Sequence, residues 1–139
     1  MPLAKVHLLE GQYDSPRIGQ LSEAIQNALI EVLGIPHDDF FQIHHVLPRD
    51  RYRHTPSFLG QEYSDDMILL ELTFITGRPK ETRLALLKSL NEKVVAAVDR
   101  PGRFGGPAVR GRRRERFIRQ RPCAESPHRG SELTVFAQR

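Results

Sequence analysis

Hydrophobic residues in the first third of the chain follow two spacings, one typical of strands and one typical of helices. Residues 3–9 and 40–47 are rich in apolar, β-branched and aromatic side chains, which predicts two strands. Between them the apolar residues recur at helical spacing; they are Ile18, Leu21, Ile25, Ala28, Leu29 and Val32. Ser15 followed by Pro16 predicts the N-cap and the first helical position, and Gly34 predicts the end. The predicted order is strand, helix, strand.

The same order then begins again. Residues 48–64 are rich in Pro, Arg, His, Tyr and Gly, which predicts a long connection with a short hairpin near Tyr52 or Phe58. Residues 67–75 form the most apolar run in the chain and predict a central strand. A turn over 77–79 leads into a second helix, whose predicted apolar face comprises Leu84, Leu87, Leu90, Val94 and Val98. We therefore expect a duplicated βαβ unit with parallel strands within each unit and both helices on one face of the sheet.

Composition divides the chain at about residue 98. Residues 1–98 carry 10 Lys and Arg against 13 Asp and Glu, whereas residues 99–139 carry 11 Arg, no Lys and 4 acidic residues. The second part is also rich in Gly and Pro and has no strand-length apolar run before the segment 133–136. We predict one domain over 1–98 and an irregular, disordered tail over 99–139.

Several classes of protein are excluded at this stage. No apolar run approaches the length of a membrane helix, and residues 1–9 lack the features of a signal peptide, so we expect a soluble cytoplasmic protein. The single cysteine, Cys123, has no partner for an internal disulfide and no ligand spacing for zinc. No metal or cofactor is predicted, and Cys123 is interpreted as incidental.

The chain begins Met1-Pro2, and this start carries the first candidate chemistry. Initiator Met is normally removed when the second residue is small, which would leave Pro2 with a free secondary amine. A free α-amino group titrates near pH 8 in model peptides, so Pro2 is a candidate general base. Many proteins begin Met-Pro without catalytic consequence, so this feature alone does not decide the function.

Further motifs occur in order along the chain: Met1-Pro2-Leu3, Gly34-Ile35-Pro36-His37-Asp38-Asp39-Phe40-Phe41-Gln42, Phe58-Leu59-Gly60, Ser64-Asp65-Asp66, and Thr76-Gly77-Arg78-Pro79-Lys80-Glu81-Thr82-Arg83. Over residues 1–98 the chain resembles the tautomerase superfamily, which includes 4-oxalocrotonate tautomerase and malonate semialdehyde decarboxylase, and in particular its longer members with a duplicated βαβ unit. The resemblance implies an α/β fold (α+β in some schemes), a homotrimer and a small carboxylate substrate. It implies that Pro2 is the base, that Arg78 binds the substrate carboxylate, and that Asp39 orients or activates water.

Two departures from the family pattern affect the predicted activity. The decarboxylase members carry a second arginine shortly before the position of Arg78, where this chain has Thr76, so proton transfer on an enol or keto acid is favoured over decarboxylation. Pro79 stands where the family usually has Ser or Thr, which removes one backbone donor.

His44 and His45 should point to opposite faces of their strand, so only one of them can line a pocket. Tyr52 on the long connection is a further candidate for closing over the substrate.

Alternative interpretations remain at this stage. The chain could be a decarboxylase or hydratase of the same family, or an inactive member. It could also bind nucleic acid electrostatically through the Arg-rich run 112–121, although the ordered motifs favour an enzyme.

The family's closing Ser-Phe-Gly-Asn-Gly motif is missing. Codons can be chosen for residues 115–122 that encode this motif in another reading frame, so we hypothesise a frameshift near 98–101, which the gene's nucleotide sequence would test.

Overall fold

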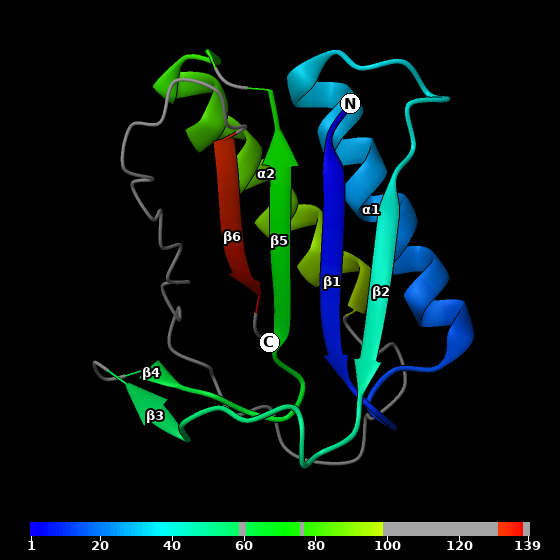
Figure 1. Cartoon of the computed structure of the whole chain (residues 1–139), viewed down its shortest axis with the longest axis vertical. Coiled ribbons are helices and arrows are strands. Elements are labelled where there is room, and N and C mark those ends of the chain that lie inside the picture. Colours follow the sequence, from blue (N-terminus) through cyan, green and yellow to red (C-terminus); the bar gives the residue numbers. More distant parts are fainter. Residues whose placement is uncertain (59–60, 76, 99–130, 138–139) are drawn as a thin grey trace, which may run out of the picture.

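The computed structural model describes residues 1–58, 61–75, 77–98 and 131–137, the last stretch through its backbone only (Figure 1). The elements are β1 (Leu3–Leu9), α1 (Ser15–Leu33), β2 (Gln42–Leu47), β3 (Ser57–Phe58), β4 (Gln61–Glu62), β5 (Ile68–Phe74), α2 (Lys80–Val98) and β6 (Ser131–Ala137). Four strands form one sheet in the order β2-β1-β5-β6, and both helices lie against the same face of it. The predicted α/β architecture is confirmed.

The core lies between the sheet and the two helices because each strand places every second side chain on that side. Residues with even numbers in β1 and β5 are almost fully buried, whereas those with odd numbers are only partly buried, apart from Leu9 at the end of β1, which is buried. The buried strand side chains pack against helix residues in one cluster, which contains Val6, Leu8, Leu70, Leu72, Leu21, Ile25, Leu86 and Leu90 among others. The odd-numbered side chains of β1 and β5 therefore lie on a face without a helix, which we call the open face.

The N-cap of helix α1 lies one residue earlier in the chain than the sequence predicted. Asp14, not Ser15, is the N-cap residue, and its carboxylate accepts a hydrogen bond of 3.0 Å from the backbone N–H of Arg17. A carboxylate can both satisfy a free N–H group and interact favourably with the positive end of the helix dipole. Gly34 ends the helix as predicted, in the left-handed region with φ of 65°, where its N–H donates to the carbonyl of Ile30.

The first βαβ unit is parallel as predicted, and the second unit differs. β1 pairs with β2 in parallel and with β5 in antiparallel orientation. β6 pairs with β5 in antiparallel orientation, because Ser131 lies beside Phe74 at the end of the sheet where β5 finishes. A parallel closing strand would have started at the opposite end. Seven residues of the predicted irregular tail thus form a strand, so the prediction of an irregular tail is wrong for 131–137. The rest of the tail lies outside the described residues, together with Cys123, the Arg-rich run and the segment of the hypothesised frameshift.

The long connection holds the predicted hairpin near Phe58, formed by β3 and β4, which pair only with each other. The connection is joined to the residues before β5 by Arg49, whose guanidinium donates two hydrogen bonds to the carboxylate of Asp65. Within the described part of the chain, no helix has the length and apolar character that a membrane crossing requires.

The core makes one direct prediction about stability. Leu70→Ala removes a side chain that is 1% exposed, so it should lower the free energy of unfolding by about 2 to 5 kcal/mol, through lost burial and a residual cavity. Leu84→Ala is the matched control, because Leu84 is 47% exposed and the change should stay within about 0.5 kcal/mol. Urea unfolding followed by circular dichroism measures both. Equal effects would show that Leu70 is not part of the core.

Candidate active site

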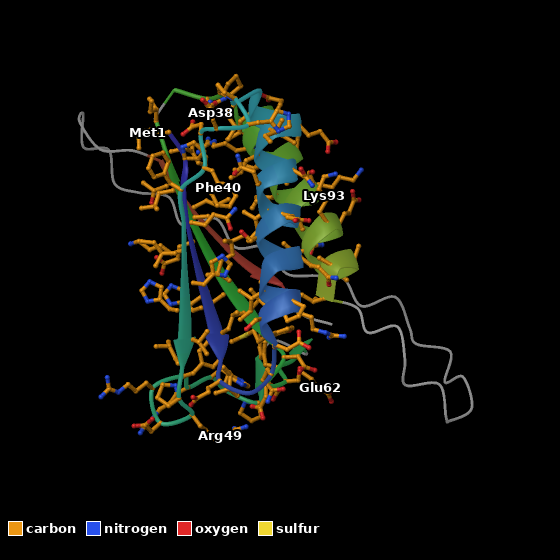
Figure 2. All side chains as sticks on the ribbon, turned by 90° about the vertical axis from the view of Figure 1, so that its right-hand side faces the viewer. Met1, Asp38, Phe40, Arg49, Glu62 and Lys93 are labelled. Atoms are coloured by element: carbon orange, nitrogen blue, oxygen red, sulfur yellow. The ribbon has the colours of Figure 1, made fainter. Side chains whose placement is uncertain are left out.

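Three predicted site residues lie at the same end of the sheet. Leu3 at the start of β1 pairs with Thr73 near the end of β5, and Ala4 pairs with Gln42 at the start of β2. Pro2, Asp39 and Arg78 belong to the segments that enter or leave these strand ends, and so they come to the same end. Figure 2 shows this end through Met1, Asp38 and Phe40, far from Arg49 and Glu62 at the opposite end.

The amino terminus lies beside an acidic side chain. Pro2 is buried, and the ammonium group of Met1 is 3.4 Å from Oδ2 of Asp39, whose side chain is 17% exposed. In the chain with Met1 attached, the nitrogen of Pro2 is an amide. Removal of Met1 would turn the nitrogen of Pro2 into an amine. This nitrogen lies one residue further along the chain than the ammonium group that now contacts Asp39. Asp39 thus lies at the terminus where that amine would form.

The loop that carries Asp39 is held by a buried polar residue of α1. Gln26 is 7% exposed, and its Nε2 donates a hydrogen bond of 3.2 Å to the backbone carbonyl of Asp39. Sequence reasoning missed Gln26. The available signal was the pair Ser22 and Gln26, two polar residues four positions apart on a helix that is otherwise apolar toward the sheet, since this spacing puts both on one side. Ser22 in turn exchanges hydrogen bonds with Gln42 of β2.

Arg78 lies between β5 and α2. Gly77 before it has φ of 92°, a left-handed conformation that lets the chain leave the sheet sharply, and α2 begins two residues later at Lys80. Nη1 of Arg78 donates a long hydrogen bond of 3.4 Å to the carbonyl of Leu33, the last residue of α1. A guanidinium has five N–H donors, so this single weak contact leaves the group with donors to offer an anion.

His44 and His45 point to opposite faces of β2, as predicted. His44 faces α1, where its Nε2 lies 3.2 Å from Oε1 of Gln42. Since an amide oxygen only accepts hydrogen bonds, Nε2 carries the proton, and Nδ1 is buried with no partner among the described residues. Burial lowers the pKa of His44, so its imidazole is held neutral. His45 lies on the open face, where its ring is 4.8 Å from that of His7.

Tyr52 is not brought together with Pro2 in this chain. It packs with Leu9 and Met67 near the end of β1, the opposite end of the sheet from Pro2. Its hydroxyl donates a hydrogen bond of 2.7 Å to the carbonyl of Met67, and burial raises its pKa to about 12. The structure therefore gives Tyr52 a packing role, which its place on a polar connection did not indicate.

Apolar side chains are exposed beside the candidate site. Met1 and Ile75 are 71% and 70% exposed, and Phe40 and Phe41 are 47% and 45% exposed. They flank the amino terminus, the start of β2 and the end of β5. An arginine with donors to spare, a buried proline next to the amino terminus and an apolar border form a surface whose chemistry suits a small acid with an apolar part. Among the described residues, no three His, Cys, Asp or Glu side chains are grouped to hold a metal ion.

Comparison with known proteins points to one family. Residues 38–102 match the family model described as tautomerase enzyme, a range that includes Asp39 and Arg78. Probable tautomerase YusQ of Bacillus subtilis (strain 168) is 28% identical over 94 residues, which cover 68% of this chain and 73% of YusQ. Probable tautomerase YrdN of the same organism is 27% identical over 94 residues, covering 68% and 71%.

Solved structures share the fold at lower identity. FG41 malonate semialdehyde decarboxylase inhibited by 3-bromopropiolate has a TM-score of 0.60 and 22% identity, and the match covers 69% of this chain and 72% of that one. A fused 4-OT symmetric trimer has a TM-score of 0.53 and 23% identity, covering 69% and 73%. The strand and helix arrangement, the family model and the two Bacillus relatives lead to one conclusion: this chain belongs to the tautomerase superfamily.

Proposed function

We propose that the mature chain is a cofactor-independent tautomerase that uses the nitrogen of Pro2 as general base in keto–enol isomerisation of a small 2-oxo or enol acid. The observation that carries the proposal is the contact of 3.4 Å between the amino terminus and Asp39, at the end of the sheet where Pro2 and Arg78 also lie. In ketonisation, the neutral amine takes the proton of the enol hydroxyl, and the resulting ammonium returns a proton to the neighbouring carbon, so that no group is gained or lost.

Arg78 supports this proposal by its chemistry and its surroundings. Its guanidinium has donors left over after the bond to Leu33, and two parallel N–H groups match the two oxygens of a carboxylate. The carboxylate of the substrate would sit there, with the reacting carbons toward Pro2. The apolar side chains of Met1, Phe40, Phe41 and Ile75 favour a substrate whose remaining part is apolar, and Met1 itself would be absent from the mature protein.

Assembly is part of the same proposal. Among the fused 4-OT structures with a similar fold, one is described as a symmetric trimer and another as an asymmetric trimer, and we propose that this chain also forms a homotrimer. Support comes from β2, a sheet edge with Ile43 and Val46 exposed at 44% and 47%. Uncovered edges of this kind invite pairing with another chain.

The test is an enol assay on protein of verified mass. Intact mass should show that Met1 has been removed, and the enol of phenylpyruvate should then ketonise faster with the protein than in buffer alone. An arylpyruvate enol is suited to the test because it combines a carboxylate for Arg78 with an apolar group. A protein that lacks Met1 and leaves the rate at the buffer value would contradict the proposed activity.

A hydratase or decarboxylase is the second candidate, favoured by one observation. Asp39 is the acidic residue that the resemblance connects with water activation, and it lies at the amino terminus with most of its side chain shielded. Such a reaction would require Asp39 to accept a proton from water, which ketonisation does not. The two functions are therefore separated by the effect of Asp39→Asn on each reaction.

A further inference from the structure

The interior between α1 and the sheet contains one side chain that its apolar surroundings do not explain. Of the buried side chains in the described part of the chain, Gln26 is the one with a terminal amide or a charged group. Its Nε2 donates a hydrogen bond to the carbonyl of Asp39, and its Oε1 is buried with no partner among the described residues. A buried amide that is only half satisfied costs free energy relative to an apolar side chain of similar shape. The contribution of Gln26 to stability is therefore a weak reason for its presence.

The partner of Gln26 is the one residue of its loop that turns inward. In the loop 36–41 every residue is exposed except Asp39, whose side chain is 17% exposed. The N–H of Asp39 donates a hydrogen bond of 3.2 Å to the carbonyl of Pro36, and its carbonyl accepts the bond of 3.2 Å from Gln26. A carbonyl only accepts hydrogen bonds, so the amide of Gln26 can satisfy this contact in one orientation only. Both backbone groups of Asp39 are thus fixed, one by the loop itself and one by the core.

We propose that Gln26 is a positioning residue: by holding the backbone of Asp39, it keeps the Asp39 carboxylate at the amino terminus, where the carboxylate sets the pH range in which Pro2 acts as a base. The inference rests on the proposed function, in which the nitrogen of Pro2 is the base, and adds a residue that touches neither the amine nor the substrate. Few rotatable bonds join the carboxylate of an aspartate to its backbone, so a fixed backbone restricts the carboxylate to a few positions.

The direction of the pH effect follows from the charges at this end of the sheet. The titratable and charged side chains of the surrounding segments are Lys5 and Glu71 on the open face, His37, Asp38 and Asp39 before β2, and Arg78 and Lys80 after β5. Within the described residues, only Asp39 forms an ion pair with the terminal nitrogen. A carboxylate that moves away from an amine stops favouring its protonated form, and the base is then neutral at lower pH. Release of Asp39 should therefore move the acidic limb of the rate profile to lower pH.

Gln26→Met tests this, because methionine is similarly long and unbranched but has no N–H donor. We expect the acidic limb of enol ketonisation to move to lower pH by about half a pH unit, the size expected for a carboxylate about 4 Å from an amine in water. The Michaelis constant should stay unchanged, since the substitution leaves Arg78 in place. Ser22→Ala is the matched control: Ser22 lies one turn earlier on the same side of α1, but it bonds to Gln42 and not to Asp39, so the limb should not move.

The double variant Gln26→Met, Asp39→Asn separates positioning from a general loosening of the structure. If Gln26 acts only through Asp39, the acidic limb of the double variant coincides with that of Asp39→Asn alone. Additive shifts, an equal shift in Ser22→Ala, or no shift in Gln26→Met would each overturn the inference. Circular dichroism and the urea midpoint are recorded for every variant, and Gln26→Leu, which also lacks the donor, replaces Gln26→Met if the latter does not fold.

Direct titration of the amine distinguishes failure of this inference from failure of the proposed activity. The chain is labelled with ¹⁵N-proline, and intact mass confirms that Met1 has been removed. Of the 10 prolines, only an amino-terminal Pro2 has a nitrogen that titrates, so its ¹⁵N resonance reports the protonation of the amine without any substrate. A shifted titration in Gln26→Met without ketonisation by the unmodified chain overturns the proposed reaction alone. Ketonisation with an unshifted titration overturns the role of Gln26 alone, and a chain that retains Met1 overturns both.

Discussion

Insertion of one glutamine between Met1 and Pro2 should reduce enol ketonisation by about 10²- to 10⁴-fold, the range that a positioned general base contributes. A large second residue prevents removal of Met1, so the nitrogen of Pro2 stays an amide without a basic lone pair. The inserted chain keeps every side chain of the site, including Asp39 and Arg78. The measurement is the rate of ketonisation by native and inserted protein at equal concentration, with intact mass recorded for each.

The control for this experiment concerns folding, because Pro2 is buried next to β1. Circular dichroism and the urea midpoint should be close to those of the native chain, since the insertion falls at a terminus that is 71% exposed at Met1. Pro2→Ala is the complementary variant. It retains an amino-terminal amine after Met removal and should therefore lose less activity than the insertion. Equal rates for native and inserted protein would show that Pro2 is not the base.

The local elements were predictable from the sequence because each depends on near neighbours. Apolar residues at helical spacing gave α1 and α2, and apolar runs gave β1, β2 and β5. The capping residue was wrong by one position, since Asp14 and Ser15 are both good N-cap types and only the backbone decides between them. The orientation of β6 could not be predicted, because the sequence of a strand does not determine beside which end of its neighbour the strand begins.

The candidate site was predictable only in part. The segments of Pro2, Asp39 and Arg78 were found as motifs in the sequence. Their position at one end of the sheet follows from the pairing of β1 with β2 and β5, which is a long-range property. Tyr52 was a candidate for closing over the substrate, but it packs near the end of β1, away from Pro2, because the path of a connection cannot be derived from its composition. Gln26 was missed because its partner is a backbone carbonyl, which leaves no trace in the sequence of the loop.

Two charges of opposite sign act on the proposed amine of Pro2, and the structure assigns them different positions. Asp39 contacts the ammonium group of Met1, and a carboxylate equally close to the amine of Pro2 would favour the protonated form of that amine. Arg78 follows β5, and a guanidinium close to that amine would disfavour the protonated form. A base is active when it is neutral, so the rate rises with pH through the pKa of the amine. The two side chains should therefore move the acidic limb of the profile in opposite directions.

Arg78→Ala should lower the catalytic efficiency by about 10- to 100-fold, mainly through a higher Michaelis constant. It removes a charge-assisted bond to the substrate carboxylate, which is worth about 1.5 to 3 kcal/mol. It should also shift the acidic limb to higher pH, because loss of the cation raises the pKa of the amine. Asp39→Asn should shift the limb to lower pH and spare ketonisation near neutrality, while slowing any reaction that needs an activated water.

Kinetics between pH 5 and 9 on enol substrates check both variants, with matched controls from the same chain. Arg53→Ala removes an exposed arginine on the long connection, and Asp38→Asn removes the exposed neighbour of Asp39, so both should stay near the unmodified profile. The amine mechanism requires opposite shifts because the two charges differ in sign. Shifts in the same direction would contradict the amine mechanism, and shifts of similar size in the two control variants would show that global charge, not proximity to the amino terminus, sets the profile. An unchanged Michaelis constant and an unchanged limb in Arg78→Ala would place the carboxylate site elsewhere, even though the fold is that of the family.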